Sequence, residues 1–163
     1  MSTWQNRIVG TGEEAPDQLL ANPRNWRIHP QHQQDALAGV LKEIGWVQDV
    51  IVNRRTGFVV DGRLRVALAL RYQQSTVPVK YVDLSDAEEV LVLATLDPIG
   101  AMAGRDDEKL HELIADANPQ DAELKKLLAA VEADTSGVPS DDAQPTLLTT
   151  CPQCGHEFDA TKE

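Results

Sequence analysis

The chain has few aromatic residues and no long apolar run. Phenylalanine, tryptophan and tyrosine together make up 4% of its 163 residues, so leucine, valine, isoleucine and alanine must form most of the core. No run of 18 apolar residues is present, so we expect no membrane-spanning segment. The first residues lack the apolar stretch of a signal peptide. These absences predict a cytoplasmic protein.

Cysteine is equally scarce, because Cys151 and Cys154 are the only two and share one Cys-x-x-Cys motif. This pattern argues against a disulfide framework and favours a reducing compartment. Two thiolates at this spacing can share one Zn²⁺, and His156 could supply a third ligand. The fourth ligand would come from a second copy, another protein or a nearby carboxylate. The alternative is a flexible tail with two reduced cysteines.

Positively charged residues are scarce in the second half of the chain. Residues 1–83 carry ten Lys and Arg against eight Asp and Glu, a net charge of +2, whereas residues 84–163 carry five against eighteen, a net charge of −13. An acidic chain does not attract a phosphate backbone through its overall charge. Any contact with DNA must therefore be made locally by the first half, or by a partner protein.

The hydrophobic pattern predicts an α+β fold, with a small mixed sheet, packed helices, a C-terminal helical extension and a short Cys/His tail. A capping box at Ser85 to Glu88 predicts a helix from about 86 to 96, ended by Asp97-Pro98. The other expected elements are a helix over 31–44, strands over 49–53, 58–61 and 77–84, a helix over 62–72, and acidic amphipathic helices over 106–117 and 120–133. The resulting organisation is a flexible N-terminus (1–15), a domain (16–103), the helical extension (104–133), a linker (134–148) and a zinc-knuckle-like tail (149–163).

The stretch TGFVVDGRLRVALAL, residues 56–70, places a glycine and two arginines where a strand becomes a helix. A helix N-terminus presents unpaired amides that suit a phosphate. Gly62 would let an anion approach the backbone, and Arg63 and Arg65 could grip its oxygens. Asp61 could cap the helix, orient an arginine or hold a metal. The alternative is an ordinary turn with Asp61 as the cap and solvated arginines.

Several motifs in this order resemble the N-terminal domain of ParB, which is shared with sulfiredoxin. They are an Asn-Pro-Arg loop, a helix ending in glycine, a strand that bears a glutamine, the Gly-Arg turn, a Val-Pro strand and an acidic helix, over residues 16–100. The Asp-Gly-x-Leu-Arg turn is most similar to the ParB-like domains found with phage and mobile-element DNA methyltransferases. The corresponding turn carries the reactive cysteine in sulfiredoxin, and this chain has none before residue 151, so the resemblance does not imply sulfiredoxin activity.

The resemblance implies that Gly62 and Arg65 bind nucleotide phosphates, since they match the ParB glycine and second arginine at this turn. It places Gln48 and Arg24 at the same pocket. Asp97 falls near a metal-associated Glu-Asn pair of ParB, although Pro98 replaces the Asn. The implied cofactors are a nucleoside triphosphate with Mg²⁺.

We therefore expect a nucleotide- or phosphate-binding protein that acts in DNA transactions, as an accessory to DNA modification in a phage or mobile element. It would act on DNA directly or through a DNA-modifying partner, as a monomer or a homodimer, with no membrane partner. NTP hydrolysis and phosphotransfer stay open, because the sequence names no general base. One alternative is a non-catalytic adaptor that keeps the fold and binds proteins. A lower-ranked alternative is a nuclease, which would need a carboxylate and histidine cluster for its metals.

Overall fold

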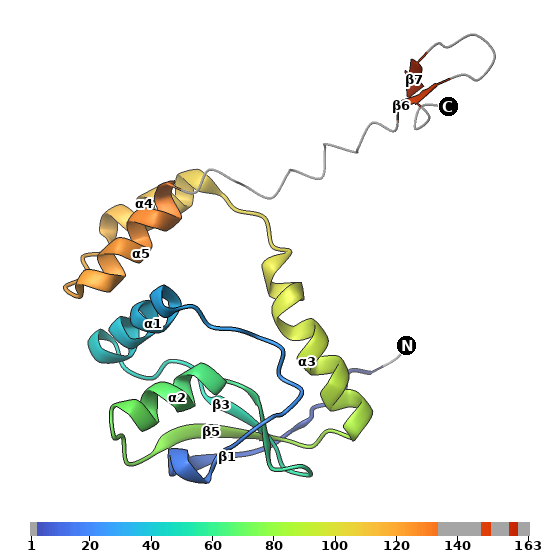
Figure 1. The fold of residues 1–163 in the computed structure, drawn as a ribbon, viewed down its shortest axis with the longest axis vertical. Coiled ribbons are helices and arrows are strands. Elements are labelled where there is room, and N and C mark those ends of the chain that lie inside the picture. The colour runs from blue at the N-terminus through green and yellow to red at the C-terminus, as the bar shows by residue number, and fades with distance from the viewer. Residues whose placement is uncertain (1–2, 134–147, 151–156, 160–163) are drawn as a thin grey trace.

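A five-stranded mixed sheet forms the centre of the molecule (Figure 1). We describe it from a computed structural model that covers residues 3–133, 148–150 and 157–159. The strand order is β1–β5–β3–β4–β2, with β5 parallel to β3 and β4 parallel to β2, while β1 pairs with β5 and β3 with β4 in antiparallel fashion. The strands are β1 (Ile8–Glu14), β2 (Leu20–Ala21), β3 (Val50–Asn53), β4 (Phe58–Asp61) and β5 (Val77–Val82).

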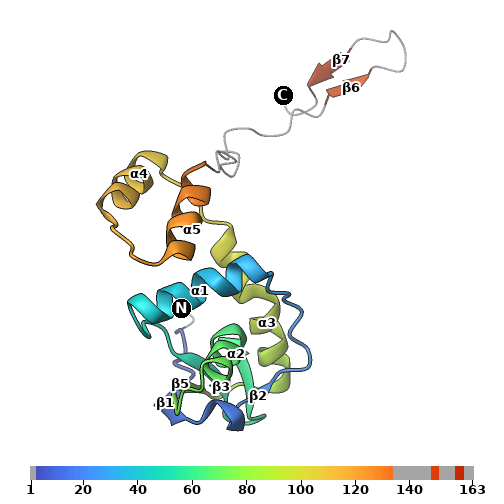
Figure 2. The same ribbon diagram turned by 60° about the vertical axis from the view of Figure 1, so that its left-hand side comes forward.

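Five α-helices pack around this sheet, and the mixed α+β architecture confirms the predicted fold class. In two views, α2 covers the sheet, α1 lies beyond α2, and the α4–α5 pair lies beyond α1, while α3 runs along the side (Figures 1 and 2). Outside this unit, β6 (Leu148–Thr150) pairs with β7 (Glu157–Asp159) in antiparallel fashion. The helical elements are a 3₁₀ turn (Pro16–Gln18), α1 (Gln31–Glu43), α2 (Arg63–Arg71), α3 (Asp86–Ala101), α4 (Asp107–Asp116) and α5 (Ala122–Ala133).

Valine dominates the core, as the scarcity of aromatic residues predicts. The branched side chains of three strands pack against one face of α2, and the half-buried Trp46 and Tyr81 rings flank them. Branched side chains fit the pleated surface of a sheet and are favoured there. The buried cluster consists of Val50, Val52, Val59, Val66, Ala69, Val77 and Val79.

The first strand corrects the prediction that residues 1–15 are loosely held. Residues 8–14 form β1, which pairs along its length with β5. Side chains add two links, because Thr76 donates a hydrogen bond to Glu13 at 3.0 Å and the Tyr81 hydroxyl donates one to Glu14. Almost all β1 residues are exposed, so the strand has no apolar alternation that could reveal it in the sequence.

The third helix corrects a second prediction, because α3 passes through Pro98 and ends at Ala101. Proline disfavours a helical conformation in the residue before it and removes one backbone donor. The last turn is closed beyond the proline by the Met102 amide, which donates to the carbonyls of Pro98 and Ile99 at 3.2 Å each. The extra turn carries Asp97 within a helix rather than in a loop.

A buried carboxylate ties α3 to the sheet. Glu89 is 6% exposed and accepts hydrogen bonds from Asn22 Nδ2 at 2.8 Å, Asn53 Nδ2 at 2.6 Å and Thr56 Oγ1 at 2.6 Å. Burial alone would raise the pKa of Glu89, but these three donors and the charge of Arg24 outweigh it and lower the pKa. The Glu89 cluster therefore fixes the direction of α3 relative to β3.

Candidate functional site

The turn between β4 and α2 adopts a conformation that requires glycine. Gly62 has φ +93°, in the left-handed region, and stands at the N-cap of α2. A Cβ at this position would lie 2.9 Å from Arg65 Nη1 and 3.2 Å from the Val50 Cα atom. In the described part of the chain, no side chain caps this helix. The first amides of α2 therefore have neither an intrahelical partner nor a side-chain cap.

Asp61 organises the charged groups beside this turn. Its carboxylate accepts from Arg27 Nη1 at 3.3 Å and from Arg65 Nη1 at 3.4 Å, and Gln48 Nε2 lies 3.5 Å from it. Arg65 also donates to the side-chain oxygen of Gln48. The Arg65 guanidinium thus folds back over the turn, and its side chain is only 15% exposed.

These groups line a small pocket of about 150 Å³. Asp97 joins it from α3 and forms an ion pair with Arg27. Three arginines (+3) and two aspartates (−2) among the lining residues give a net charge of +1, with histidine neutral. The lining residues are Arg27, His29, Gln33, Leu37, Asp61, Gly62, Arg63, Leu64, Arg65 and Asp97.

Arg27 carries a donor that its surroundings do not satisfy. Its Nη2 atom is buried and has no hydrogen-bond partner among the described residues. A buried unpaired donor costs free energy, and an acceptor from a ligand or water would remove that cost. The donor is therefore compatible with an oxyanion ligand, while the rest of the Arg27 guanidinium already pairs with Asp61 and Asp97.

The structure brings together most of the site residues predicted from the sequence. Asp61, Gly62, Arg63, Arg65 and Asp97 line the pocket, and Gln48 borders it through its bonds to Asp61 and Arg65.

Arg24, which we expected at this pocket, is not among its lining residues. Its backbone N–H donates to Asn22 Oδ1 at 2.9 Å, and its charge acts on Glu89. The tight turn after Asn22 therefore places Arg24 with the Glu89 cluster.

Five lining residues are not among the predicted site residues. Arg27 and His29 come from the loop before α1, Gln33 and Leu37 come from α1 itself, and Leu64 comes from α2. His29 Nδ1 lies 3.0 Å from Gln33 Oε1. The polar character of the loop is visible in the sequence, but its approach to Asp61 depends on contacts between residues 34 positions apart.

The described residues include no group of three or more His, Cys, Asp or Glu side chains that could hold a metal ion. Cys151, Cys154 and His156 lie outside the described residues, so the zinc site stays a prediction.

At the small pocket, Asp61 and Asp97 offer two carboxylates. Magnesium is commonly bound by one or two carboxylates together with substrate phosphates and water, so these residues fit Mg²⁺ only alongside a phosphate ligand.

A scan against models of known protein families finds no match, and a search of curated proteins finds none either. Among solved structures, the chain is similar to the C-terminally truncated chromosome-partitioning protein ParB from Caulobacter crescentus, complexed with CTP-γ-S. The TM-score is 0.51 and the identity 22%, over 64% of this chain and 61% of that one. The chain has the fold of a ParB N-terminal domain.

Two structures of pNOB8-like ParB N-domains are also similar, with TM-scores of 0.49, identities of 14% and 12%, and coverage of 95% and 97% of this chain. The matches span 61%, 59% and 56% of the three known chains. At these identities the similarity concerns the fold alone and does not extend to the activity of the ParB proteins.

In the described part of the chain, no helix has both the length and the apolar character to cross a bilayer.

Proposed function

We propose that the small pocket binds the phosphate groups of a nucleotide. The observation that carries this proposal is the geometry of Gly62, whose left-handed conformation begins α2 directly beneath the Arg65 guanidinium. Any side chain at position 62 would fill the space that lets an anion reach the backbone. The amides of the first helical turn and the Arg65 guanidinium then converge on the same oxyanion.

Asp61 acts in this proposal as a positioning residue. It holds Arg27 and Arg65 by ion pairs of 3.3 Å and 3.4 Å, so both guanidinium groups are oriented before a ligand arrives. Orientation in advance reduces the entropy lost on binding. Arg63 would contact the phosphate from the first position of the helix. Gln48 accepts a hydrogen bond from the Arg65 guanidinium and so helps to hold it in place.

Mg²⁺ would be held by Asp97 and Asp61 together with the phosphate oxygens, and it would neutralise phosphate charge in the pocket. Zn²⁺ belongs to a separate proposal, for Cys151, Cys154 and His156 in the C-terminal tail. Hydrolysis is not part of the proposal, since the described lining residues suggest no general base beyond His29 and the paired carboxylates.

The wider role that we propose is in DNA transactions. Support comes from the shared fold with a chromosome-partitioning ParB whose structure holds CTP-γ-S. The more specific role as an accessory to DNA modification in a phage or mobile element rests on the Asp-Gly-x-Leu-Arg turn alone. In either case the acidic charge of the second half requires that DNA be met by the first half or through a partner.

Isothermal titration calorimetry of the full chain with CTP, ATP and GTP, with and without Mg²⁺, tests this function. We expect Arg65→Ala to weaken binding by roughly 10- to 100-fold, because charge-assisted hydrogen bonds are worth about 1.5–3 kcal/mol. Arg71→Ala is the matched control, since Arg71 lies at the other end of α2 and donates to Gln34 at 2.8 Å. Equal affinities of both variants and the wild type would rule out the phosphate site.

One observation favours the non-catalytic adaptor as a second candidate. Arg27, Arg65, Asp61 and Asp97 already pair with one another, so the charges of the turn are largely balanced without a ligand. If no nucleotide releases heat or raises the melting temperature of the wild type, this alternative is favoured. The Gly62 turn would then be a structural feature that positions α2.

A further inference from the structure

A second cavity lies apart from the small pocket. It has a volume of about 680 Å³, within the range of small-molecule sites. It is a groove between α1, the C-terminal half of α2 and the start of α5, and we call it the α1/α5 groove. Its lining residues are Asp35, Ala38, Gly39, Leu41, Lys42, Trp46, Leu68, Ala69, Tyr72, Gln74, Asp121 and Glu123.

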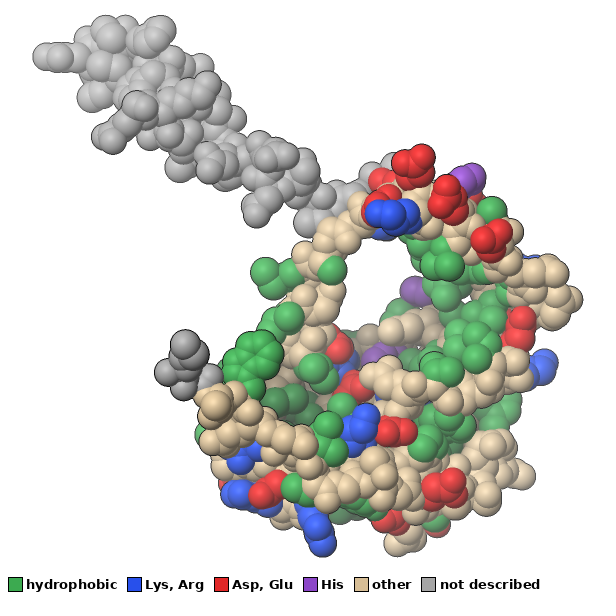
Figure 3. All heavy atoms as spheres, turned by 180° about the vertical axis from the view of Figure 1, so that it is seen from behind, with side chains coloured by type: hydrophobic (Ala, Val, Ile, Leu, Met, Phe, Trp, Pro, Cys, Tyr) green, Lys and Arg blue, Asp and Glu red, His purple; other side chains and the backbone are tan. Residues whose placement is uncertain are grey.

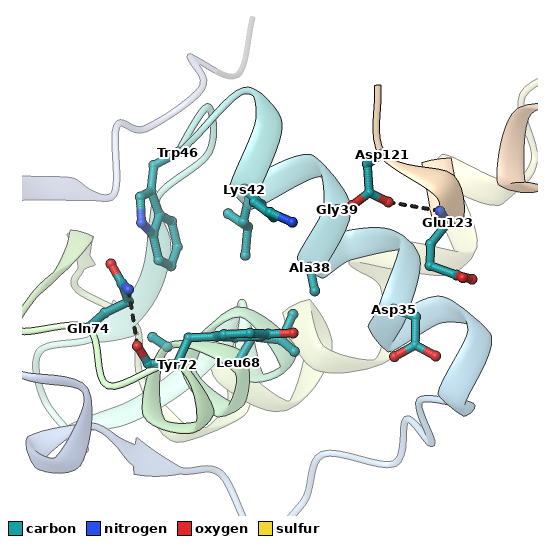
Figure 4. A pocket seen from close by; sticks show the side chains of 12 residues that line it. Asp35, Ala38, Gly39, Lys42, Trp46, Leu68, Tyr72, Gln74, Asp121 and Glu123 are labelled. Atoms are coloured by element: carbon teal, nitrogen blue, oxygen red, sulfur yellow. Dashed lines mark hydrogen bonds between the residues drawn. The ribbon is translucent and has the colours of Figure 1, made fainter. Parts of the chain in front are cut away.

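The two ends of this groove differ in chemistry (Figure 4). The Trp46 ring lies at one end, and the Tyr72 ring, next to Leu68, lies between Trp46 and the other end. Asp35, Asp121 and Glu123 gather at the other end, where α1 meets α5. Lys42 is the one cation among the lining residues, so three carboxylates against one ammonium leave a net charge of −2.

Tight contacts between the helices build the acidic end. A Cβ at Gly39 would lie 2.7 Å from Asp121 Oδ1 and 3.1 Å from Leu124 Cγ, so a larger residue here would force side chains of the α5 segment to move. The Glu43 carboxylate accepts from the amides of Gln120 and Asp121 at 2.8–3.0 Å. The wall of the groove is therefore part of the packed structure.

The three carboxylates differ in the hydrogen bonds and ion pairs that they already make within the protein. Asp121 caps α5 by accepting from the amides of Glu123 and Leu124 at 2.8 Å and 3.2 Å, and Glu123 pairs with Lys126 at 2.6 Å. Asp35 accepts from the neutral Gln31 amide at 2.7 Å. In the described structure no cation is hydrogen-bonded to Asp35, although Lys126 lies near enough for the two charges to interact.

We propose that the α1/α5 groove binds a small organic cation, an amine or guanidine carried on an apolar or aromatic body. The body would lie over Trp46 and Tyr72, and the cationic end would face Asp35. The aromatic rings pack against the apolar or aromatic body, and the carboxylates attract the cationic end. The same charges repel phosphates, so the groove selects against the nucleotides proposed for the small pocket. The acidic C-terminal segment of the chain is also disfavoured as an occupant, because residues 134–163 hold six Asp and Glu and one Lys.

A nuclear magnetic resonance titration of the full chain with phenylpropylamine tests this proposal. Phenylpropanol and phenylpropionate serve as neutral and anionic probes of similar shape. We expect the amine to shift the amide signals of Gly39, Lys42 and Gln74 saturably, and the alcohol and the acid to bind at least fivefold more weakly. Shifts that are equal for all three probes, or confined to the exposed face of α4, would overturn the proposal.

Two variants locate the contacts. Asp35→Asn should weaken amine binding roughly fivefold, the upper range for a partly exposed ion pair, and leave phenylpropanol binding unchanged. Tyr72→Leu should weaken both, since Tyr72 is 59% exposed and is not needed for the core. Asp116→Asn, at the end of α4 and outside the groove, is the control for charge alone. Tight binding of a lysine-rich peptide without any binding of the amine would also overturn the small-ligand assignment.

Discussion

The two ends of α2 face two different kinds of cavity. At its N-terminal end, the pocket beside Gly62 is small, about 150 Å³, and its lining has a net charge of +1. Along its C-terminal half, the α1/α5 groove is about 680 Å³, with an aromatic end and a net charge of −2. The larger cavity is thus the less suited to a phosphate, and volume alone does not identify the site that binds one.

The two ends of α2 also differ in the charge of the ligand that we propose for each. The N-terminus of a helix favours anions and the C-terminus favours cations. The surrounding side chains reinforce both preferences, with Arg65 at the first end and Asp35 beside the second. A space-filling view shows basic and acidic side chains interspersed on one face, so this sorting is local (Figure 3).

The largest expected effect comes from disrupting the hydrogen bonds of Glu89, which hold α3 and its Asp97 beside the small pocket. Glu89→Gln keeps the shape of the side chain but places an amide N–H₂ against donors from Asn22, Asn53 or Thr56. We expect a loss of about 3 kcal/mol in the free energy of unfolding, since a buried donor is left unpaired. Urea denaturation would measure it. Glu88→Gln, at the neighbouring and more exposed carboxylate, should cost less.

The same variant should change how stability depends on pH. The folded-state pKa of Glu89 is lowered, so its carboxylate stabilises the fold above the unfolded value of about 4.3. This contribution is lost as the pH falls through the lowered folded pKa. The difference in unfolding free energy between the wild type and Glu89→Gln should therefore become smaller as the pH falls below 4. A constant difference across that range would contradict an ionised Glu89.

The second effect concerns the left-handed turn. Gly62→Ala should cost about 3 kcal/mol, because it combines left-handed strain with a close approach to the Val50 backbone. Gly45→Ala is a matched control, since Gly45 also has φ +93° but would meet no atom within 4 Å. It should cost about 1 kcal/mol. Equal losses in thermal unfolding would show that the approach to Val50 is not tight.

The third effect concerns the groove. Gly39→Ala should disturb Asp121, the cap of α5, and lower the protection of α5 amides from hydrogen exchange by about fivefold, roughly 1 kcal/mol. Gly100→Ala, in α3 with open space around it, should instead stabilise its helix by up to about 1 kcal/mol. If Gly39→Ala stabilises the chain in the same way, the close approach of α1 and α5 is not required.

The smallest effect concerns the metal. Asp97 is 47% exposed and pairs with Arg27, so Asp97→Asn should change nucleotide affinity without Mg²⁺ by less than about threefold. The gain in affinity on adding Mg²⁺ should shrink, as calorimetry would show. Asp86→Asn, at the other end of α3, should leave that gain unchanged. An unaltered Mg²⁺ gain in Asp97→Asn would remove Asp97 from the metal site.

Much of the turn could be predicted from the sequence because its signals are local. The apolar run before Asp61, the glycine after it and the Ala/Leu-rich helix are adjacent in the chain, and β4, Gly62 and α2 lie where that pattern places them. The helix over 31–44 was predicted for the same reason, and α1 ends within one residue of it.

The rest of the site depends on contacts between distant segments. Arg27 contacts Asp61, which lies 34 residues away in the sequence, and Asp97 on α3 contacts Arg27 across an even longer separation. No local sequence pattern predicts contacts between segments that lie so far apart in the chain. The α1/α5 groove was missed altogether, because the amphipathic pattern of α5 predicts that it packs but does not identify α1 as its partner.

A crystal structure of the chain with CTP or ATP and Mg²⁺ tests the central claim most directly. We predict phosphate density against the amides after Gly62, with Arg65 turned toward it and Asp97 at the metal. Nucleotide density in the α1/α5 groove, or an Arg65 side chain that stays bonded to Asp61 and Gln48 while the nucleotide binds elsewhere, would contradict it.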